Sequence, residues 1–368
     1  MLILWILIGS ALLFILQRVV YSNYWDKKVN ISFRFSGRAV TEGESVDLFE
    51  RCENRKLLPL PTFGYFYTLI RNYISPSQPF NAPMSQRRKL ALPGRCAVTN
   101  RIRVNGLLRG VYSIDTTTVS SSDLFHTIRL NWTAGCASRL IVYPSKIPVQ
   151  KLALPARLLL GAVTTRRMAQ EDPFALKSIR PYEICDSPRI INWKASAKTG
   201  ELKVNQFEYT TDESLLLLLD MGGGEIEDRE QLIRLASSLS LFFLHRGVSI
   251  SLMANCRNII SGKPVRVRSG ADITHQITVD EALAQINLAV PVTEPFCEFL
   301  SAVSKENTKG ALPVVLSADP SGEARQAFRS TPGVRDGYYF FVGNDGSVLP
   351  ERGPSMVKES DAEREERL

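Results

Sequence analysis

The chain lacks the residue patterns that mark most metal and redox centres. Its 368 residues include six cysteines and three histidines. No two cysteines form a Cys-x-x-Cys pair, which argues against a zinc site or a dithiol redox motif, and dispersed thiols are typical of a reduced, cytoplasmic protein. A Cys–His catalytic pair would need one of three histidines that are each better explained as structural residues: His126, His245 and His275.

Charge is missing from the beginning of the chain. Residues 1–16 contain no charged side chain, and the apolar character continues for several residues more, close to the ~20 residues that a helix needs to cross a bilayer. No Lys or Arg precedes the run and no Ala-x-Ala site follows it, so a cleaved signal peptide is not favoured. Arg18, Lys27 and Lys28 come after the run, and Lys and Arg are enriched on cytoplasmic flanks. We expect a single-pass anchor in the cell membrane at residues 1–22, with the bulk of the chain cytoplasmic.

Acidic residues are nearly absent from residues 51–110. This stretch holds eleven basic residues and one acid, Glu53, a local net charge of +10, whereas the whole chain has +8. A basic surface beside a bilayer gains roughly 1 kcal/mol for each Lys or Arg held close to anionic lipid. No zinc finger, helix-turn-helix or RNA-binding motif accompanies the charge. The imbalance therefore favours membrane lipid as a partner and argues against nucleic acid.

Residues 29–143 show short runs in which apolar and polar positions alternate between Gly, Pro, Asn and Ser residues. Such runs occur at 31–35, 45–49, 102–104 and 139–143. This density of period-two runs predicts an antiparallel β-sandwich over 29–143. Four prolines then mark residues 144–175 as a connector, with a short apolar helix expected at 156–163.

Beyond residue 200 the pattern changes to alternating strands and helices. The apolar run Leu215–Leu219 predicts a strand buried on both faces, and apolar residues recur at helical spacing over 228–246. Further strands are predicted at 248–253, 312–316 and 338–342, and further helices at 280–288, 296–305 and 323–329. This alternation favours a doubly wound α/β domain within 176–350, followed by a solvated charged tail at 351–368.

Residues 176–204 are the densest in charged and aromatic side chains. Seven candidate site residues fall within fifteen positions: Arg180, Tyr182, Asp186, Arg189, Asn192, Trp193 and Lys194. Their spacing resembles the signature of bacterial membrane proteins called domain of unknown function 58 (DUF58), although Cys185 stands where that family usually has Gly. Arg109-Gly-x-Tyr and Asp123-x-Phe resemble the family's membrane-proximal region. The resemblance implies a von Willebrand factor A-like α/β domain and a link with MoxR-type AAA+ ATPases.

The signature has two explanations, and the sequence leaves both open. Arg180 and Arg189 can form bidentate pairs with carboxylates such as Asp186, while Trp193 and Tyr182 are residue types enriched at interface hot spots. The cluster is either a docking element for a partner or a network that locks the connector onto the first strand of the α/β domain.

The loop that follows the first α/β strand is a candidate metal site. In von Willebrand factor A domains this strand ends in Asp-x-Ser-x-Ser, whose Asp and hydroxyls help to hold a divalent ion; Asp220 matches, but Gly222 and Gly224 replace the serines. Asp319 supplies a second carboxylate at the same edge if the strand order is that of the implied fold. Mg²⁺ needs about six oxygen ligands, so a structural glycine turn without a cofactor is favoured. A nucleotide is also disfavoured, because the Lys-Ser/Thr of a P-loop is absent.

The sequence therefore favours a non-catalytic, membrane-anchored interaction scaffold or adaptor that partners a AAA+ ATPase in assembly, maturation or envelope stress. The first alternative is a metal-dependent ligand-binding module that uses Asp220 and Asp319. The second is a hydrolase or transferase with Cys185 as the nucleophile, because nearby arginines lower a thiol pKa, although the adjacent Asp186 opposes this.

Overall fold

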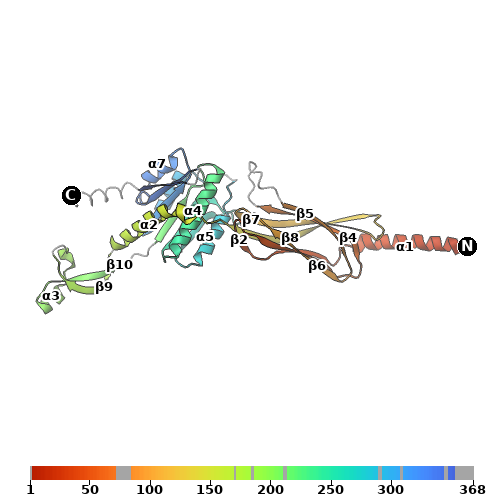
Figure 1. The fold of residues 1–368 in the computed structure, drawn as a ribbon, viewed down its shortest axis with the longest axis horizontal. Coiled ribbons are helices and arrows are strands. Elements are labelled where there is room, and N and C mark those ends of the chain that lie inside the picture. Colours follow the sequence, from red (N-terminus) through yellow and green to blue (C-terminus); the bar gives the residue numbers. More distant parts are fainter. Residues whose placement is uncertain are drawn as a thin grey trace. The chain divides into compact units, whose positions relative to one another are not determined.

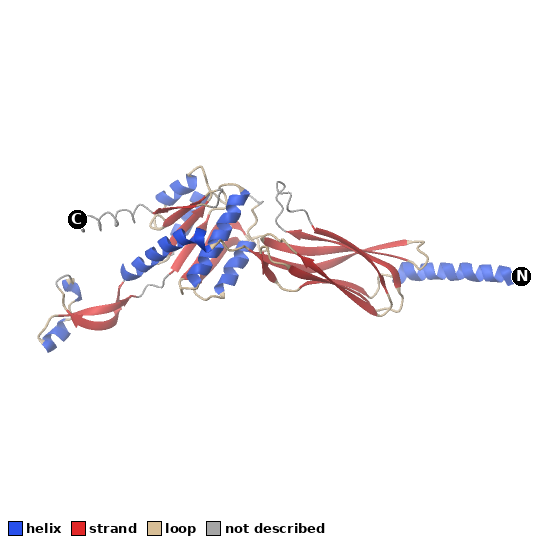
Figure 2. Cartoon of the chain, viewed as in Figure 1, coloured by secondary structure: helices blue, strands red, loops and turns tan. Residues whose placement is uncertain are grey.

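The computed structural model describes residues 2–71, 84–169, 171–183, 186–209, 214–288, 292–306, 310–343 and 347–352. The chain is a mixed α/β protein with an N-terminal apolar helix and several sheets (Figures 1 and 2). It divides into two compact units. The first contains residues 1–145 and 283–290, and the second contains residues 146–282 and 291–368.

The first unit begins with α1 (Leu2–Tyr24), whose residues 3–24 are long and apolar enough to cross a membrane. Only its last turns contact the rest of the unit. The Tyr21 side chain is 1% exposed and its hydroxyl donates to the Pro59 carbonyl at 2.7 Å, while the Gln17 amide donates to Asp123 at 3.0 Å. The remaining surface of the helix is exposed and apolar, as the anchor prediction requires.

Two sheets follow α1 in the first unit. The three-stranded sheet has the order β1 (Val29–Phe35), β3 (Val46–Asn54), β6 (Cys96–Val104), with antiparallel pairs. The five-stranded sheet has the order β2 (Ala39–Thr41), β8 (Arg129–Tyr143), β7 (Gly110–Ser122), β4 (Leu60–Arg71), β5 (Met84–Leu92), with a parallel β2–β8 pair. The alternating burial of β1 puts every second side chain into a core shared with the five-stranded sheet. The strands predicted from alternation are thus confirmed.

The second unit contains a six-stranded sheet whose four central strands are parallel. Its order is β13 (Pro264–Gly270), β12 (Ser249–Arg257), β11 (Ser214–Leu219), β14 (Leu312–Ser317), β15 (Tyr338–Val342), β16 (Val348–Arg352), and the two edge strands pair antiparallel. The predicted strands at 215–219, 312–316 and 338–342 are confirmed.

Burial on both faces explains the run of leucines in β11. Leu216 and Leu218 share a cluster with residues of α6 (Phe296–Lys305) and α7 (Glu323–Ser330). The alternate leucines point to the opposite face and are equally buried. The helix α4 (Ile226–Leu244) contacts β12, β14 and β15. A strand without a solvated face needs no polar positions.

Two helix predictions have wrong bounds. The connector helix α2 runs over Val149–Ala169 rather than 156–163, because a buried stripe at helical spacing continues across Pro155: Leu152, Ala156, Leu159 and Val163. The helix predicted at 280–288 is α5 (His275–Ala284). The Arg109 guanidinium, which is fully buried in the first unit, donates to the carbonyls of Leu283 (2.7 Å) and Ile286 (3.0 Å) in the same unit, and such capping accompanies a helix end.

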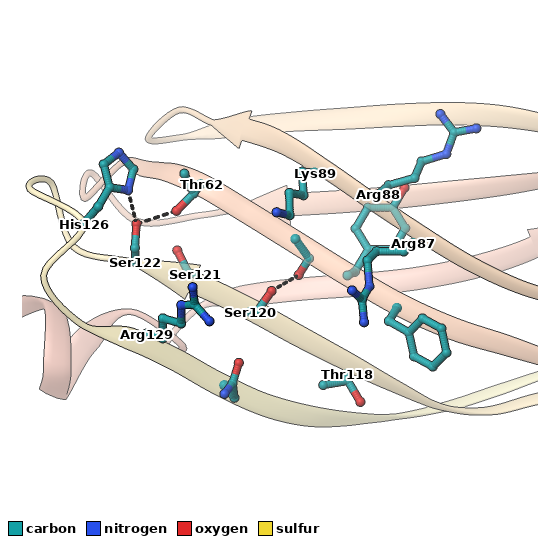
Figure 3. A pocket seen from close by; sticks show the side chains of 14 residues that line it. Thr62, Arg87, Arg88, Lys89, Thr118, Ser120, Ser121, Ser122, His126 and Arg129 are labelled. Carbon is teal, nitrogen blue, oxygen red and sulfur yellow. Dashed lines mark hydrogen bonds between the residues drawn. The ribbon is translucent and has the colours of Figure 1, made fainter.

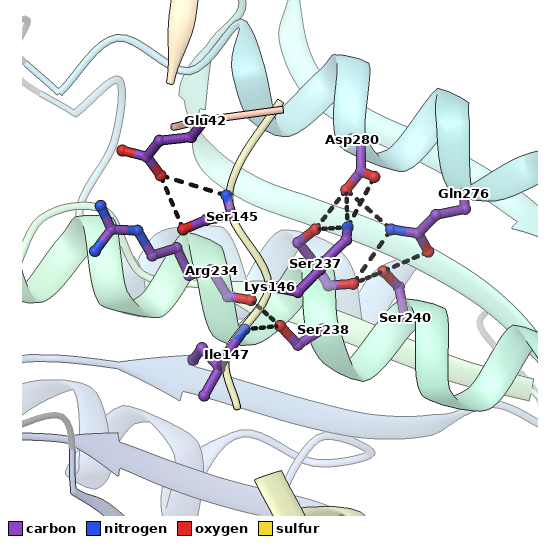
Figure 4. A network of polar contacts seen from close by, with 10 residues as sticks. All are labelled: Glu42, Ser145, Lys146, Ile147, Arg234, Ser237, Ser238, Ser240, Gln276 and Asp280. Atoms are coloured by element: carbon purple, nitrogen blue, oxygen red, sulfur yellow. Dashed lines mark hydrogen bonds and ion pairs between the residues drawn. The ribbon is translucent and has the colours of Figure 1, made fainter. Parts of the chain in front are cut away.

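A buried polar network in the second unit joins its first residue, Lys146, to α4 and α5 (Figure 4). The Lys146 ammonium donates to both oxygens of Asp280 at 2.8 Å, and the Gln276 amide donates to the same carboxylate at 2.9 Å. Ser237 also donates to Asp280, and Ser240 donates to Gln276 at 3.0 Å. Burial lowers the pKa of Lys146, although Asp280 opposes the shift. The network fixes where the chain enters this unit.

Replacing Lys146 with methionine leaves the Asp280 carboxylate without its cation. We expect Lys146→Met to lower the free energy of unfolding by roughly 1–3 kcal/mol, below the usual cost for a fully buried pair because the Lys146 side chain is 32% exposed. Lys263 is exposed, and Lys263→Met should change stability by less than about 0.5 kcal/mol. Equal denaturant midpoints for the two variants would show that the network contributes nothing to stability.

Candidate functional site

The signature lies in a small element of the second unit that we call the arm, residues 171–209 (Figure 2). Its strands β9 (Glu171–Pro181) and β10 (Lys203–Tyr209) form an antiparallel two-stranded sheet. Between them lie a 3-10 turn, η2 (Pro188–Ile190), and the helix α3 (Trp193–Thr199). In the described part of the chain neither strand pairs with β11, so the signature does not lock onto the first strand of the six-stranded sheet through backbone pairing.

Three signature residues make hydrogen bonds within the arm: Arg180, Asp186 and Asn192. The Arg180 guanidinium makes a bidentate contact with Asp186, at 2.7 Å to Oδ2 and 2.5 Å to Oδ1, and the Glu183 N–H donates to Oδ2 at 2.8 Å. The hydrogen bonds from Arg180 and Glu183 lower the pKa of Asp186. Their stabilising effect is therefore present above the ordinary pKa of Asp and is lost as the pH falls through the lowered value.

Asn192 fixes the beginning of α3. Its Oδ1 accepts from the Ala195 N–H at 2.9 Å, the geometry of a helix N-cap, and its Nδ2 donates to Asn205 of β10 at 2.7 Å. The side chain thus joins the helix to the sheet. Gly200 ends the helix in the left-handed conformation with φ 75°.

The other signature residues are exposed or half-buried. The Trp193 side chain is 68% exposed, and Arg189 and Lys194 are exposed as well. Tyr182 is half-buried, and its N–H donates to the Leu202 carbonyl at 2.9 Å. We call Arg189, Trp193 and Lys194 the exposed triplet. Cys185 lies outside the described residues, so the structure does not bear on a Cys185 nucleophile.

Asp220 is brought together with two polar residues that the sequence did not single out. Its Oδ1 accepts from the Gly222 N–H (3.0 Å) and the Asn255 amide (3.2 Å), and its Oδ2 accepts from the Ser317 hydroxyl (2.8 Å). Asn255 and Ser317 lie near the carboxyl ends of β12 and β14, the parallel neighbours of β11. The signal available in the sequence was that each residue follows the end of a predicted strand, at 248–253 and 312–316; the order of the strands was not available. Burial raises the pKa of Asp220, which is 3% exposed, against these hydrogen bonds.

Asp319 lies at the same edge of the sheet, as expected, and lines one cavity of about 230 Å³ together with Asp220. Its Oδ1 accepts from the Ser321 N–H (2.9 Å) and hydroxyl (2.6 Å), and its Oδ2 accepts from the Ala324 N–H in α7 (3.0 Å). Burial acts to raise the pKa of Asp319, but these hydrogen bonds outweigh it and the pKa is lowered.

The polar groups around Asp220 and Asp319 donate hydrogen bonds to the two carboxylates and do not offer the oxygen ligands that a divalent cation needs. The Asn255 amide presents N–H groups to Asp220, because its oxygen accepts from the Met221 N–H at 2.8 Å. Among the described residues no three His, Cys, Asp or Glu side chains are grouped as metal ligands. A hard cation needs about six oxygens, whereas both carboxylates already accept from protein donors. These residues therefore do not fit a tightly held Mg²⁺.

The three glycines of the loop after Asp220 differ in how much room each has for a side chain. A Cβ on Gly222 would lie 3.3 Å from Asp220 Oδ1, a contact that a small shift relieves. A Cβ on Gly223 would lie 2.5 Å from Asp319 Cβ. Gly224 has φ +73°, and its Cβ would lie 2.6 Å from the Ala318 carbonyl oxygen. The loop therefore excludes a serine at 224 and accommodates one at 222.

Serine substitutions at the two positions should separate in stability. We expect Gly224→Ser to lower the free energy of unfolding by about 2 kcal/mol or more, because the residue needs a left-handed backbone and meets Ala318. Gly222→Ser should cost less than about 1 kcal/mol. Thermal unfolding of the full chain measures both, and an equal loss at the two positions would contradict the described loop geometry.

Residues 178–319 match the family described as protein of unknown function DUF58, a segment that contains most of the arm, the glycine loop and Asp319. No curated protein matches the chain. Three of the solved structures that it resembles are similar only weakly. The CARDB domain of a Pyrococcus furiosus protein, solved with di-metal ions, has 11% identity and a TM-score of 0.22, over 32% of this chain and 94% of that domain.

Two further solved structures give similar values. AvmM, which catalyses macrocyclization in alchivemycin A biosynthesis, has 13% identity and a TM-score of 0.24, over 33% of this chain and 94% of its own. The Pseudomonas fluorescens alkylpurine DNA glycosylase AlkC, bound to DNA with an abasic site analog, has 11% identity and a TM-score of 0.19, over 33% and 36%. Likeness at this level carries no argument about function. Residues 178–319 are thus similar to the DUF58 family, in agreement with the resemblance of the signature.

Proposed function

We propose that this protein is a non-catalytic, membrane-anchored interaction protein whose arm docks a partner. The observation that carries the proposal is the 68% exposed Trp193 at the beginning of a helix whose backbone is fixed by side-chain hydrogen bonds. A side chain whose backbone is already fixed loses less conformational entropy on binding than one on a mobile segment. Trp and Arg are also the residue types enriched at binding hot spots.

The anchor is α1, and the bulk of the chain lies in the cytoplasm. Support comes from the apolar length of residues 3–24 and from the basic residues that follow the span, Lys27 and Lys28. Trp25 and Tyr21, both buried, tie the end of the helix to the first unit. A tether of this kind holds the unit next to the bilayer.

We assign the two sheets of the first unit to a β-sandwich and the second unit to a von Willebrand factor A-like domain. A core shared by both sheets supports the sandwich. Parallel central strands with buried residues on both faces support the α/β assignment. In this scheme the arm is an insertion that presents the exposed triplet. The glycine loop at 222–224 stands where von Willebrand factor A domains have their metal-binding loop, but it lacks the serine hydroxyls.

The partner that the family resemblance implies is a MoxR-type AAA+ ATPase. The exposed triplet carries two cations and one indole, so it suits an acidic surface with an apolar pocket. The process served would be assembly, maturation or a response to envelope stress.

Substitutions in the exposed triplet should weaken partner capture without unfolding the arm. We expect Trp193→Ala and Arg189→Ala, in the detergent-solubilised full chain, to reduce recovery of a AAA+ ATPase from the host at least tenfold. Truncating a hot-spot side chain costs about 1–4 kcal/mol of binding free energy. Mass spectrometry of the captured proteins provides the measurement.

Lys198→Ala is the matched control, because Lys198 is exposed on the same helix and is not part of the triplet. Circular dichroism establishes that all variants remain folded. Equal recovery of the ATPase by parent, triplet variants and control would show that the signature serves the fold alone.

A second candidate function is a divalent-metal-dependent ligand-binding module. It is supported by the two carboxylates, Asp220 and Asp319, that line one cavity. In this case Mg²⁺ or Mn²⁺ would release heat in calorimetry and raise the melting temperature, and Asp319→Asn would abolish both effects. From the donor set we predict neither effect for the parent chain at millimolar metal; a saturable effect lost in Asp319→Asn would favour the module over the docking protein.

A further inference from the structure

The outer face of the five-stranded sheet forms a cavity that the docking function does not use (Figure 3). Its volume is about 540 Å³, within the size range of small-ligand sites. The lining comes from β4, β5, β7 and β8 and from the turn after β7, all in the first unit. The side chains on this face therefore converge from four strands.

The rim of the cavity is cationic. Arg87, Lys89 and Arg129 are exposed lining residues, and no hydrogen bond or ion pair is recorded for their side chains within the described ranges; Arg87 lies over the Phe66 ring at 5.6 Å. Arg88 is different, since it pairs with the buried Glu50 at 3.4 Å. Among the described residues that line the cavity, none is Asp or Glu. The site thus has uncompensated positive charge, which attracts an anion.

The floor of the cavity carries hydroxyl groups. Thr62, Thr118, Ser120 and Ser122 lie on strands β4 and β7 beneath the cationic rim. Gly64 leaves the Ser120 hydroxyl accessible from the cavity, because a Cβ at position 64 would lie 2.8 Å from that hydroxyl. Ser122 hydrogen-bonds to His126 Nδ1 at 2.8 Å and to Thr62. Hydroxyls of this kind can pair with the alcohol groups of a ligand as well as with its anionic oxygens.

One end of the cavity adjoins the anchor helix. His126 belongs to the turn after β7, in which Asp123 accepts the hydrogen bond from Gln17 of α1. The Phe125 ring lies 5.7 Å from that of Phe14, and Leu124 and Phe125 are 48% and 59% exposed. An apolar turn tip beside a membrane helix belongs at the level of the lipid headgroups. The end of the cavity at His126 therefore lies near the lipid headgroups, and the cationic rim extends away from them along the sheet.

We propose that this face binds the headgroup of an anionic, hydroxyl-bearing phospholipid, with Arg87 and Arg129 on the phosphate and the hydroxyl floor on the headgroup alcohols. Guanidinium groups suit the geometry of phosphate oxygens. The trimethylammonium of a choline headgroup would be repelled by the same rim. The inference rests on the proposed membrane anchor and is independent of the partner of the arm. The general attraction between basic residues and anionic lipid would thus act at one defined site on the first unit.

The test uses the full chain in neutral detergent with short-chain lipids as probes. Calorimetry should detect saturable binding of dioctanoyl phosphatidylglycerol and at least tenfold weaker binding of dioctanoyl phosphatidylcholine. The double variant Arg87→Gln/Arg129→Gln should lose at least tenfold in affinity for phosphatidylglycerol. Arg34→Gln/Arg51→Gln removes the same charge from exposed positions on the three-stranded sheet and should remain within twofold of the parent.

Three outcomes would overturn the site. Equal losses in the two double variants would mean that the lipid senses only net charge. Glycerol 1-phosphate binding as tightly as the lipid would assign the face to a soluble phosphate ester. Incorporation of the full chain into phosphatidylcholine liposomes, resistant to carbonate extraction, tests the anchor separately. A chain that incorporates but shows no headgroup preference would contradict the site and leave the anchor standing.

Discussion

The bidentate contact between Arg180 and Asp186 is the interaction on which the proposed recognition depends. Among residues 178–183 and 186–205 of the arm, whose burial is described, only Ser196 and Val204 are buried, so this part of the arm has almost no apolar core. A two-stranded ribbon alone is marginally stable in water. Polar contacts stabilise this part of the arm: the Arg180–Asp186 pair holds the turn after β9, and Asn192 joins α3 to β10. With the backbone held in this way, the Trp193 side chain remains exposed.

The sequence predicted the elements whose side chains repeat with one clear period. The bounds of α6 and β15 follow from the patterns at 296–305 and 338–342. The two-strand form of the arm was not predicted, because among its strand residues whose burial is described only Val204 is buried, so no apolar alternation marks them. The edge strands β13 and β16 were also missed, because their apolar pattern is short: β13 buries only Val265 and Val267, and β16 has no buried residue. Packing across Pro155 likewise overrode a local helix-breaking signal.

The composition of the candidate site was predictable, but the roles of its residues were not. Spacing placed Arg180, Asp186 and Trp193 in one cluster, yet only the geometry separates the internal ion pair from the exposed indole. Asn255 and Ser317 escaped notice because their approach to Asp220 depends on strand order, which three distant segments decide together. Geometry explains why no serine stands at position 224, since only glycine adopts the backbone conformation there without strain. The proposed lipid site belongs to the first unit and the proposed docking arm to the second.

Hydrogen–deuterium exchange of the full chain, with and without Asp186→Asn, tests the central claim most directly. The substitution keeps the size of the side chain and removes its charge. If polar contacts hold the arm, amides of residues 186–205 should exchange several-fold faster in the variant while those of β11 and β14 remain unchanged. Unchanged protection of the arm would contradict the account, because Trp193 would then be positioned by something other than the Arg180–Asp186 pair.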